Sequence, residues 1–200
     1  MSKKEPKVTA AELMAKLNAD PKFVAKRARE EEERQKRAAE WRRAEAPLVE
    51  ELRAAGYAVE TAWDLVNTAA PYPKALPILL KHLARPYPGP VKEGIARALA
   101  VPEAKFGWSV LTRLYRDEQD KRAKDGLAVA IAAASDDEVI GDVIALARDR
   151  RHGPSRLLLL SALERSADPR GKATLMELGA DPELKNEVQV ILRRLKRAKR

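Results

Sequence analysis

The chain has 200 residues, 45% of them hydrophobic, which is enough apolar material for one or two domains with a buried core. Alanine and leucine dominate this fraction and aromatic residues make up only 4%, a mixture that favours packed helices over a β-sandwich. The absence of cysteine excludes disulfides and thiolate metal sites. The formal net charge of +9 comes from the two ends, +4 in residues 1–46 and +6 in residues 185–200, which leaves −1 for the residues between them.

Residues 1–46 are predicted to form a charged helical extension that precedes the main body, residues 47–200. Thr9 and Glu12 have the spacing of a capping box, and Asp20 starts a second helix. Three glutamates stand four residues before a base, the favoured order: Glu30–Arg34, Glu32–Lys36 and Glu33–Arg37. The extension is therefore either a solvated helix or an arm that docks on a partner through apolar anchors: Phe23, Val24 and Trp41.

A repeat with a period of about 32 residues, the length of a pair of short helices, runs through the rest of the chain. Gly94 and Gly126 are separated by one period, and Asp117, Asp149 and Asp181 follow one another at the same interval. Apolar and small residues recur at i, i+4, i+7 and i+8, one face of a helix, in four segments: 91–99, 123–131, 155–163 and 184–192. A second apolar column precedes these helices: Leu79, Leu111, Val143 and Leu175. Each unit is thus a pair of short helices, and the pairs must stack because one hairpin cannot bury its own apolar face.

The stretch VKEGIARALAVPEAK, residues 91–105, resembles the second helix of a HEAT-like repeat of the short bacterial kind. The resemblance covers about residues 74–195, and more weakly residues 47–70. It implies an all-α fold, a right-handed α-solenoid of about five helical pairs after the long charged helix. In that family an aspartate between the helices and a base in the second helix form a ladder along the inner edge. The matching residues are Asp117, Asp149, Asp181, Lys92, Lys124, Arg156 and Lys185.

Seven of the nine aromatic residues lie between positions 57 and 115, and this concentration is the strongest local feature. Tyr72 and Tyr87 each stand between two prolines, so we expect both rings on loops at the same edge of adjacent repeats. One interpretation is structural, with indoles that fill gaps and turns that stiffen connections. The other is functional, since aromatic residues are enriched at interface hot spots. The candidate partner-binding residues are Trp63, Tyr72, Tyr87, Trp108 and Tyr115.

The basic C-terminal end suggests an alternative function in nucleic-acid binding, although cations at a helix C-terminus also complement the helix dipole. The candidate phosphate contacts are Arg193, Arg194, Lys196, Arg197, Lys199 and Arg200. A second resemblance, to the HEAT-like alkylpurine DNA glycosylases, implies an enzyme that holds damaged DNA with Trp and Asp side chains. The matching residues would be Trp63, Asp64 and Trp108. A groove that contacts several phosphates needs bases on successive repeats, whereas the excess here lies at the ends.

No other set of residues indicates catalysis. His82 and His152, the only histidines, are far apart in the chain, and His82 falls in a core column. We therefore expect no metal, no cofactor and no enzymatic activity. No signal peptide or apolar run of about 18 residues is present, so we expect a cytoplasmic protein without membrane contact. The sequence favours a protein-binding module, either an adaptor or, as small bacterial solenoids often are, an immunity protein that sequesters a toxin.

Overall fold

The computed structural model describes residues 9–197, and these residues are all-helical, with eleven α-helices and no strand. The chain divides into two compact units, Met1–Arg43 and Ala44–Arg200. Helix α2, Pro21–Ala54, spans this boundary and continues through Pro47, the first residue of the predicted main body. Every helix in the described residues is too short or too polar to cross a lipid bilayer.

The first unit is held by contacts between residues that are close in the sequence. Helix α1, Ala10–Ala19, begins with the predicted capping box. The backbone N–H of Glu12 donates to Thr9 Oγ1 (3.3 Å), and the backbone N–H of Thr9 donates to Glu12 Oε2 (2.9 Å). These hydrogen bonds lower the pKa of Glu12. No residue of α1 is buried, and Leu13 and Met14 are about half exposed.

Charged pairs cover the solvated part of α2. Two of the three predicted i, i+4 pairs are present: Glu32–Lys36 (2.7 Å) and Glu33–Arg37 (3.8 Å). The third prediction was wrong, because Arg34 contacts Glu31 rather than Glu30. Residues three and four positions away lie on the same helix face, so either glutamate is within reach of the guanidinium.

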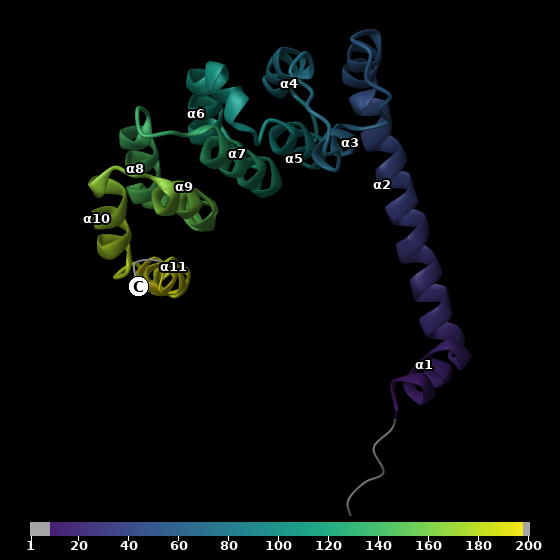
Figure 1. Ribbon diagram of the computed structural model, residues 1–200. Helices are drawn as coiled ribbons and strands as arrows, with labels where there is room; N and C mark the ends of the chain where they lie inside the picture. The colour runs from purple at the N-terminus through teal and green to yellow at the C-terminus, as the bar shows by residue number, and fades with distance from the viewer. Residues whose placement is uncertain (1–8, 198–200) are drawn as a thin grey trace, which may run out of the picture. The chain divides into compact units, whose positions relative to one another are not determined.

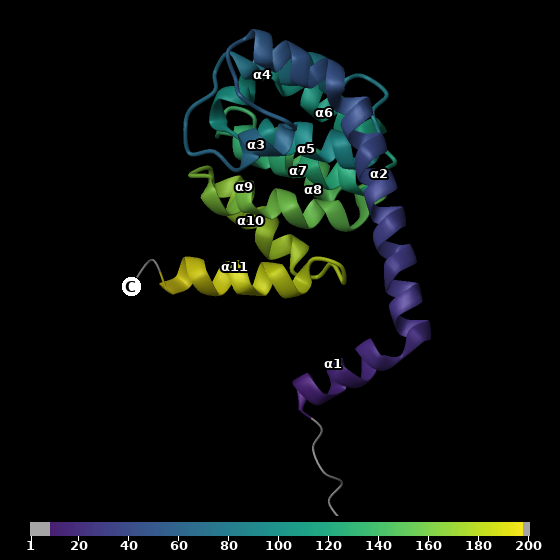
Figure 2. The ribbon, with the colours of Figure 1, turned by 90° about the vertical axis from the view of Figure 1, so that its right-hand side faces the viewer.

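The second unit consists of helices that alternate between two rows (Figure 1). One row holds α4 (Ala75–Leu83), α6 (Trp108–Asp117), α8 (Ile140–Arg148) and α10 (Pro169–Leu178). The other holds α3 (Ala62–Val66), α5 (Gly89–Ala98), α7 (Lys121–Ala134), α9 (Leu160–Arg165) and α11 (Lys185–Arg197). Helices of the second row contact their neighbours in chain order, as Figure 2 shows from α5 to α11. Each of α5, α7, α9 and α11 also packs on the helix that precedes it in the chain.

The predicted apolar columns form the core between these rows. In the first row Leu79, Leu111, Val143 and Leu175 are fully buried. In the second row the corresponding residues are Ile95, Leu127, Leu159 and Val188, and none is more than 1% exposed. Each such side chain contributes about 1.5–3 kcal/mol when it leaves water. The burial pattern therefore confirms that the repeat marks residues that pack between helices.

Two glycines of the repeat are explained by close contacts. A Cβ atom on Gly126 of α7 would lie 3.0 Å from the carbonyl oxygen of Glu93 on α5, so any side chain there would push the two helices apart. A Cβ atom on Gly94 would lie 2.8 Å from Trp63 Nε1. The absence of a side chain at position 94 makes room for the indole of α3.

The second helix of the third repeat differs from the prediction. Residues Arg150–Leu159, η2, consist of two short 3₁₀ segments separated by a kink at Gly153, and only Leu160–Arg165 is α-helical. Gly153 has φ +60°, and Pro154 lacks an N–H group, so the two segments cannot form one helix, as expected for breakers at the joint of this repeat. The difference is that the residues after the joint, 155–159, are 3₁₀ rather than α-helical. A second 3₁₀ helix, η1 (Pro102–Gly107), connects α5 to α6. Leu159 is nevertheless buried, so the apolar column is retained.

Candidate functional site

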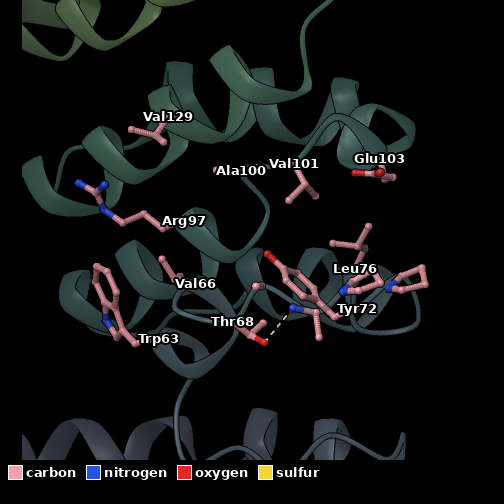
Figure 3. A pocket seen from close by; sticks show the side chains of 14 residues that line it. Trp63, Val66, Thr68, Tyr72, Leu76, Arg97, Ala100, Val101, Glu103 and Val129 are labelled. Atoms are coloured by element: carbon pink, nitrogen blue, oxygen red, sulfur yellow. Dashed lines mark hydrogen bonds between the residues drawn. The ribbon is translucent and has the colours of Figure 1, made fainter.

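A pocket of about 620 Å³ opens beside α3, α5 and the loop before α4. Its volume lies in the range of sites that take a small molecule or a large side chain. Trp63 and Arg97 stand at one end, and Tyr72 and Leu76 lie toward the other (Figure 3). We call it the aromatic pocket; its main walls are Trp63, Val66, Tyr72, Leu76, Arg97 and Val129.

Helix α3 presents Trp63 to the aromatic pocket. The indole is 38% exposed, and the guanidinium carbon of Arg97 lies 5.9 Å from its ring centroid. Arg97 is held in turn by Glu93, one turn earlier on α5, with 3.0 Å between Nε and the carboxylate. The ring face is thus supported by a cation–π contact while the indole remains reachable from solvent.

Two carboxylates fix the start of α3 and therefore the position of Trp63. Asp64 Oδ2 accepts hydrogen bonds from the backbone N–H groups of Glu60 (2.7 Å) and Thr61 (2.9 Å). Glu45 on α2 accepts from the backbone N–H of Ala62 at 2.6 Å. Burial raises the pKa of Glu45, with a further increase from the charge of Asp64, whereas the hydrogen bond from Ala62 opposes the change. Asp64 is therefore a capping residue.

Tyr72 forms the opposite wall. Its hydroxyl donates to the carbonyl oxygen of Ala98, at the end of α5, at 3.0 Å. Partial burial raises the pKa of Tyr72, and the negative charge of Glu103 adds to the effect. The hydroxyl is therefore protonated at neutral pH and ties the Pro-Tyr-Pro loop to α5, which leaves the ring as a fixed wall of the pocket.

Tyr87 lies at the other end of α4, so the expectation that both Pro-Tyr-Pro loops share one edge was wrong. One loop precedes α4 and the other follows it, and a nine-residue helix separates them by about 14 Å. The Tyr87 hydroxyl is 2.7 Å from His82 Nδ1, and His82 Nε2 is 2.8 Å from Glu51 Oε2. His82 is fully buried, which confirms its place in the core. The hydrogen bond from Lys81 lowers the pKa of Glu51 most, and the hydrogen bond with His82 lowers it further.

The two remaining aromatic candidates do not line the aromatic pocket. Trp108 is half-buried at the start of α6, and its Nε1–H donates to Asp142 of α8 at 2.8 Å. Tyr115 is fully buried, with its hydroxyl 2.8 Å from Ser155 Oγ, and burial raises its pKa to about 12. Tyr115 therefore packs inside the unit and offers no surface to a partner. Its spacing of four residues from buried Leu111 is the sequence signal for that position.

The residues proposed for the ladder occupy different environments. Arg156 and Asp181 form one rung, 3.0 Å apart and almost completely buried. Asp149 instead accepts from Arg151, two residues later, because η2 turns that guanidinium back onto it. Three of the other four members form no ion pair within residues 9–197: Asp117, Lys124 and Lys185.

Lys92, the remaining ladder residue, pairs with Glu118 at 2.8 Å rather than with an aspartate of the repeat. Burial by itself would raise the pKa of Glu118, but the hydrogen bonds from Lys92 and from the backbone outweigh it and lower the pKa. Glu118 directly follows Asp117, so the carboxylate that the base reaches is one position away from the repeated column.

The basic C-terminal residues are only partly free. Arg193, Lys196 and Arg197 are exposed on α11, whereas Arg194 contacts Glu164 at 3.1 Å and Glu187 at 3.7 Å. Two further candidates lie outside the described residues: Lys199 and Arg200. The basic surface of the described part of α11 is therefore smaller than its sequence indicates.

Several wall residues of the aromatic pocket were not predicted, although the repeat contained a signal for two of them. Arg97 and Val129 are separated by one period, so they occupy the same column on successive second-row helices. Val66 lies one period before Ala98, in a column of the repeat whose later members do not line the pocket. Within the described residues, no three His, Asp or Glu side chains are grouped so that they hold a metal ion.

Comparison with protein-family models, with curated proteins and with solved structures finds no match to this chain.

Proposed function

We propose that the protein is a non-catalytic protein-binding module whose aromatic pocket receives an apolar side chain of a partner. The observation that carries the proposal is a pocket of about 620 Å³ with Trp63, itself 38% exposed, opposite Tyr72. Tryptophan and tyrosine are enriched among the residues that contribute most to binding energy at protein interfaces. A partner side chain that enters a pocket between them is shielded from water.

The fixed positions of both walls support this proposal. Tyr72 is held by its bond to Ala98, and α3, which carries Trp63, is held by Asp64 and Glu45. Walls that are already in place lose little conformational freedom when a ligand arrives, so more of the contact energy remains as affinity. The pocket is thus suited to binding without rearrangement of its helices.

For the architecture, we interpret the two rows of helices as a right-handed α-solenoid of HEAT-like pairs. The period of the sequence, the buried columns and the contacts between successive second-row helices support this interpretation. A solenoid presents a preformed, extended surface. An adaptor, or an immunity protein that sequesters a toxin, uses such a surface without any catalytic group.

Affinity capture from the native source tests the proposal when wild-type protein is compared with Trp63→Ala and Val66→Arg. The first variant removes one wall, and the second places a charge inside the pocket. Phe106→Ala is the matched control, because Phe106 is 58% exposed and lies outside the pocket. A partner identified with the wild type should be lost with both pocket variants and kept with the control. A partner retained at equal affinity by both pocket variants contradicts the proposal.

A second candidate function, nucleic-acid binding, is favoured by one observation. Arg193, Lys196 and Arg197 are exposed on α11, while Val188 and Ile191 on its other face are buried. If this face binds phosphates, affinity for DNA or RNA falls steeply with salt, and the triple variant to glutamine lowers the salt slope by about 3. A salt slope that is unchanged in this variant rejects the candidate.

A further inference from the structure

A second pocket, of about 580 Å³, lies where the loop between α6 and α7 approaches the loop between α8 and η2. It shares no residue with the aromatic pocket. Its lining is polar and contains more cationic than anionic side chains. We call it the basic pocket; its polar lining consists of Arg116, Asp117, Gln119, Lys124, Asp149, Arg151 and His152.

Lys124 is a half-buried cation without a carboxylate partner. Its ammonium donates to the carbonyl oxygen of Glu118 at 3.1 Å and lies 5.3 Å from the ring centroid of Tyr115. It forms no ion pair with any residue in the described part of the chain. Burial lowers the pKa of Lys124, and the negative charges of Glu118 and Asp149 offset this effect only in part. A cation in this position has the capacity to accept a counter-ion.

His152 is a buried side chain that has no hydrogen bond. The imidazole is only 6% exposed, and its Nε2 lies 3.7 Å from Asp149, which is beyond hydrogen-bonding distance. No completely buried side-chain nitrogen or oxygen in the described residues lacks a partner, so the free ring nitrogens of His152 face accessible space. His152 lines the basic pocket and also a smaller adjoining cavity that shares Gln119, Lys124 and Arg151 with it.

The carboxylates of the pocket do not neutralise it. Asp149 is already occupied by Arg151, whose Nε and Nη2 donate to Asp149 Oδ2 at 3.1 and 2.7 Å. This pairing holds the pKa of Asp149 far below its usual range. Asp117 is the only other carboxylate in the pocket lining, against the two remaining cations, Arg116 and Lys124. One positive charge is therefore left over.

We propose that the basic pocket binds a small oxyanion of the phosphate type, held by Lys124, Arg116 and His152. These three lining residues belong to three different elements, α7, α6 and η2. A tetrahedral anion offers oxygen acceptors in several directions, which suits this arrangement better than a planar carboxylate. The inference concerns a pocket separate from the aromatic one and does not depend on the proposed protein-binding function.

Binding should also depend on the protonation of His152. Burial lowers the pKa of His152, and the positive charges of Lys124, Arg151 and Arg116 add to this effect, against the charge of Asp149. The imidazole is neutral at neutral pH, and a bound anion favours the imidazolium, which donates from both nitrogens. The other titratable group in contact is Tyr115, which stays protonated because its pKa is about 12. Binding of an anion whose own charge does not change with pH is therefore expected to strengthen as the pH falls through the lowered pKa of His152.

The direct test is a titration of the full chain with inorganic phosphate at constant ionic strength, followed through backbone amide NMR signals. We expect saturable shifts at residues 119–124 and 149–153. Arg116→Gln and Lys124→Gln should each weaken binding roughly tenfold, since each removes a charge-assisted contact. Arg113→Gln is the matched control for the first variant, because Arg113 is exposed on the same helix but does not line the pocket.

Three outcomes would overturn the inference. The first is a linear response without saturation, and the second is equal weakening by Arg113→Gln and Arg116→Gln. The third is a shift pattern confined to α11, which would place phosphate on the C-terminal basic residues. Because Lys124 is half-buried and its replacement can disturb folding, the exposed Arg116 provides the decisive variant.

Two further titrations characterise the site. Sulfate does not titrate between pH 5 and pH 8, so tighter sulfate binding at the lower pH reports the protonation of His152; equal affinity would remove His152 from the site. Phosphoserine is compared with inorganic phosphate to identify the source of the anion. Stronger binding of phosphoserine indicates a phosphorylated side chain, and stronger binding of inorganic phosphate indicates the free ion.

Discussion

The two units of this chain are both helical, but different interactions stabilise them. No residue from 9 to 43 is buried, so every buried residue of the described chain lies in the second unit. Helices α1 and the solvated part of α2 depend on a capping box and on hydrated charged pairs, each of which contributes little to stability. The second unit depends on side chains that contribute about 1.5–3 kcal/mol each on burial.

This difference explains why the loss of an ion pair should affect stability little in the first unit and strongly in the second. On α2 an ion pair such as Glu32–Lys36 stays hydrated, so its loss changes little. Inside the second unit Arg156 is fully buried and contacts two carboxylates, Asp181 at 3.0 Å and Glu183 at 2.5 Å. A buried ion that loses its partner retains the cost of leaving water. The same type of contact is therefore dispensable in one unit and necessary in the other.

The largest expected effect comes from Arg156→Met. The variant keeps much of the side-chain volume but removes the donors to Asp181 and to the carbonyl oxygens of Ala147 and Gly153. Arg150 still contacts Asp181 at 3.3 Å in this variant, so the carboxylate keeps one partner. We therefore expect a loss of about 3 kcal/mol in the free energy of unfolding, the lower end of the range for a broken buried pair, measured by urea denaturation.

Arg170→Met is the control for this prediction, because Arg170 is exposed and pairs with Asp168 at the surface. It should leave the urea midpoint unchanged. The double variant Arg156→Met, Asp181→Asn should recover part of the loss, since it removes the carboxylate that was left buried. Equal midpoints for Arg156→Met and Arg170→Met would show that burial does not separate the two kinds of ion pair.

A smaller, pH-dependent effect is expected at Glu45, which is 5% exposed. Burial raises its pKa in the folded state, so the folded chain retains a proton that the unfolded chain has already released. The resulting contribution to stability is complete below the ordinary pKa of glutamate and is lost as the pH rises through the folded-state pKa. Glu45→Gln keeps an acceptor for Ala62 and removes the charge.

Thermal unfolding checks this prediction. At neutral pH, Glu45→Gln should raise Tm by roughly 2–4 °C, the change that about 1 kcal/mol gives in a domain of this size. The difference from wild type should disappear below about pH 4, where both states carry the proton. A gain of the same size at both pH values would mean that the amide acts through packing and not through charge.

The fold was more predictable than the candidate site because the fold depends on a period. The columns that contain Leu79 and Ile95 return in every repeat, and burial follows from the stacking of equivalent helices. The period did not reveal that residues 155–159, after the joint at Gly153 and Pro154, are 3₁₀ rather than α-helical in the third repeat. Local backbone chemistry prevailed there over the repeat.

The aromatic pocket was only partly predictable, because a pocket depends on residues that the chain brings together from separate elements. Trp63 and Tyr72 stood out by residue type, and Arg97 and Val129 shared a column of the repeat. Residue type alone did not predict whether an aromatic ring faces solvent or the core. Tyr115 has the same residue type as Tyr72 but follows Leu111 by one helical turn, and this spacing placed it in the core.

The smallest expected effect, and the most local, is that of Thr9→Ala in the first unit. The variant removes the acceptor for the backbone N–H of Glu12 and should cost α1 about 1 kcal/mol. The hydrogen bonds from Thr9 lower the pKa of Glu12, so this carboxylate stabilises the helix above the ordinary glutamate pKa, and the stabilisation is lost as the pH falls.

Hydrogen exchange in the full chain should therefore show faster exchange at residues 11–14 in the variant at neutral pH, a smaller difference near pH 3, and no change in α7. Slower folding or faster exchange throughout α7 would mean that the cap acts beyond its own helix, and the separation between locally stabilised and core-stabilised helices would fail.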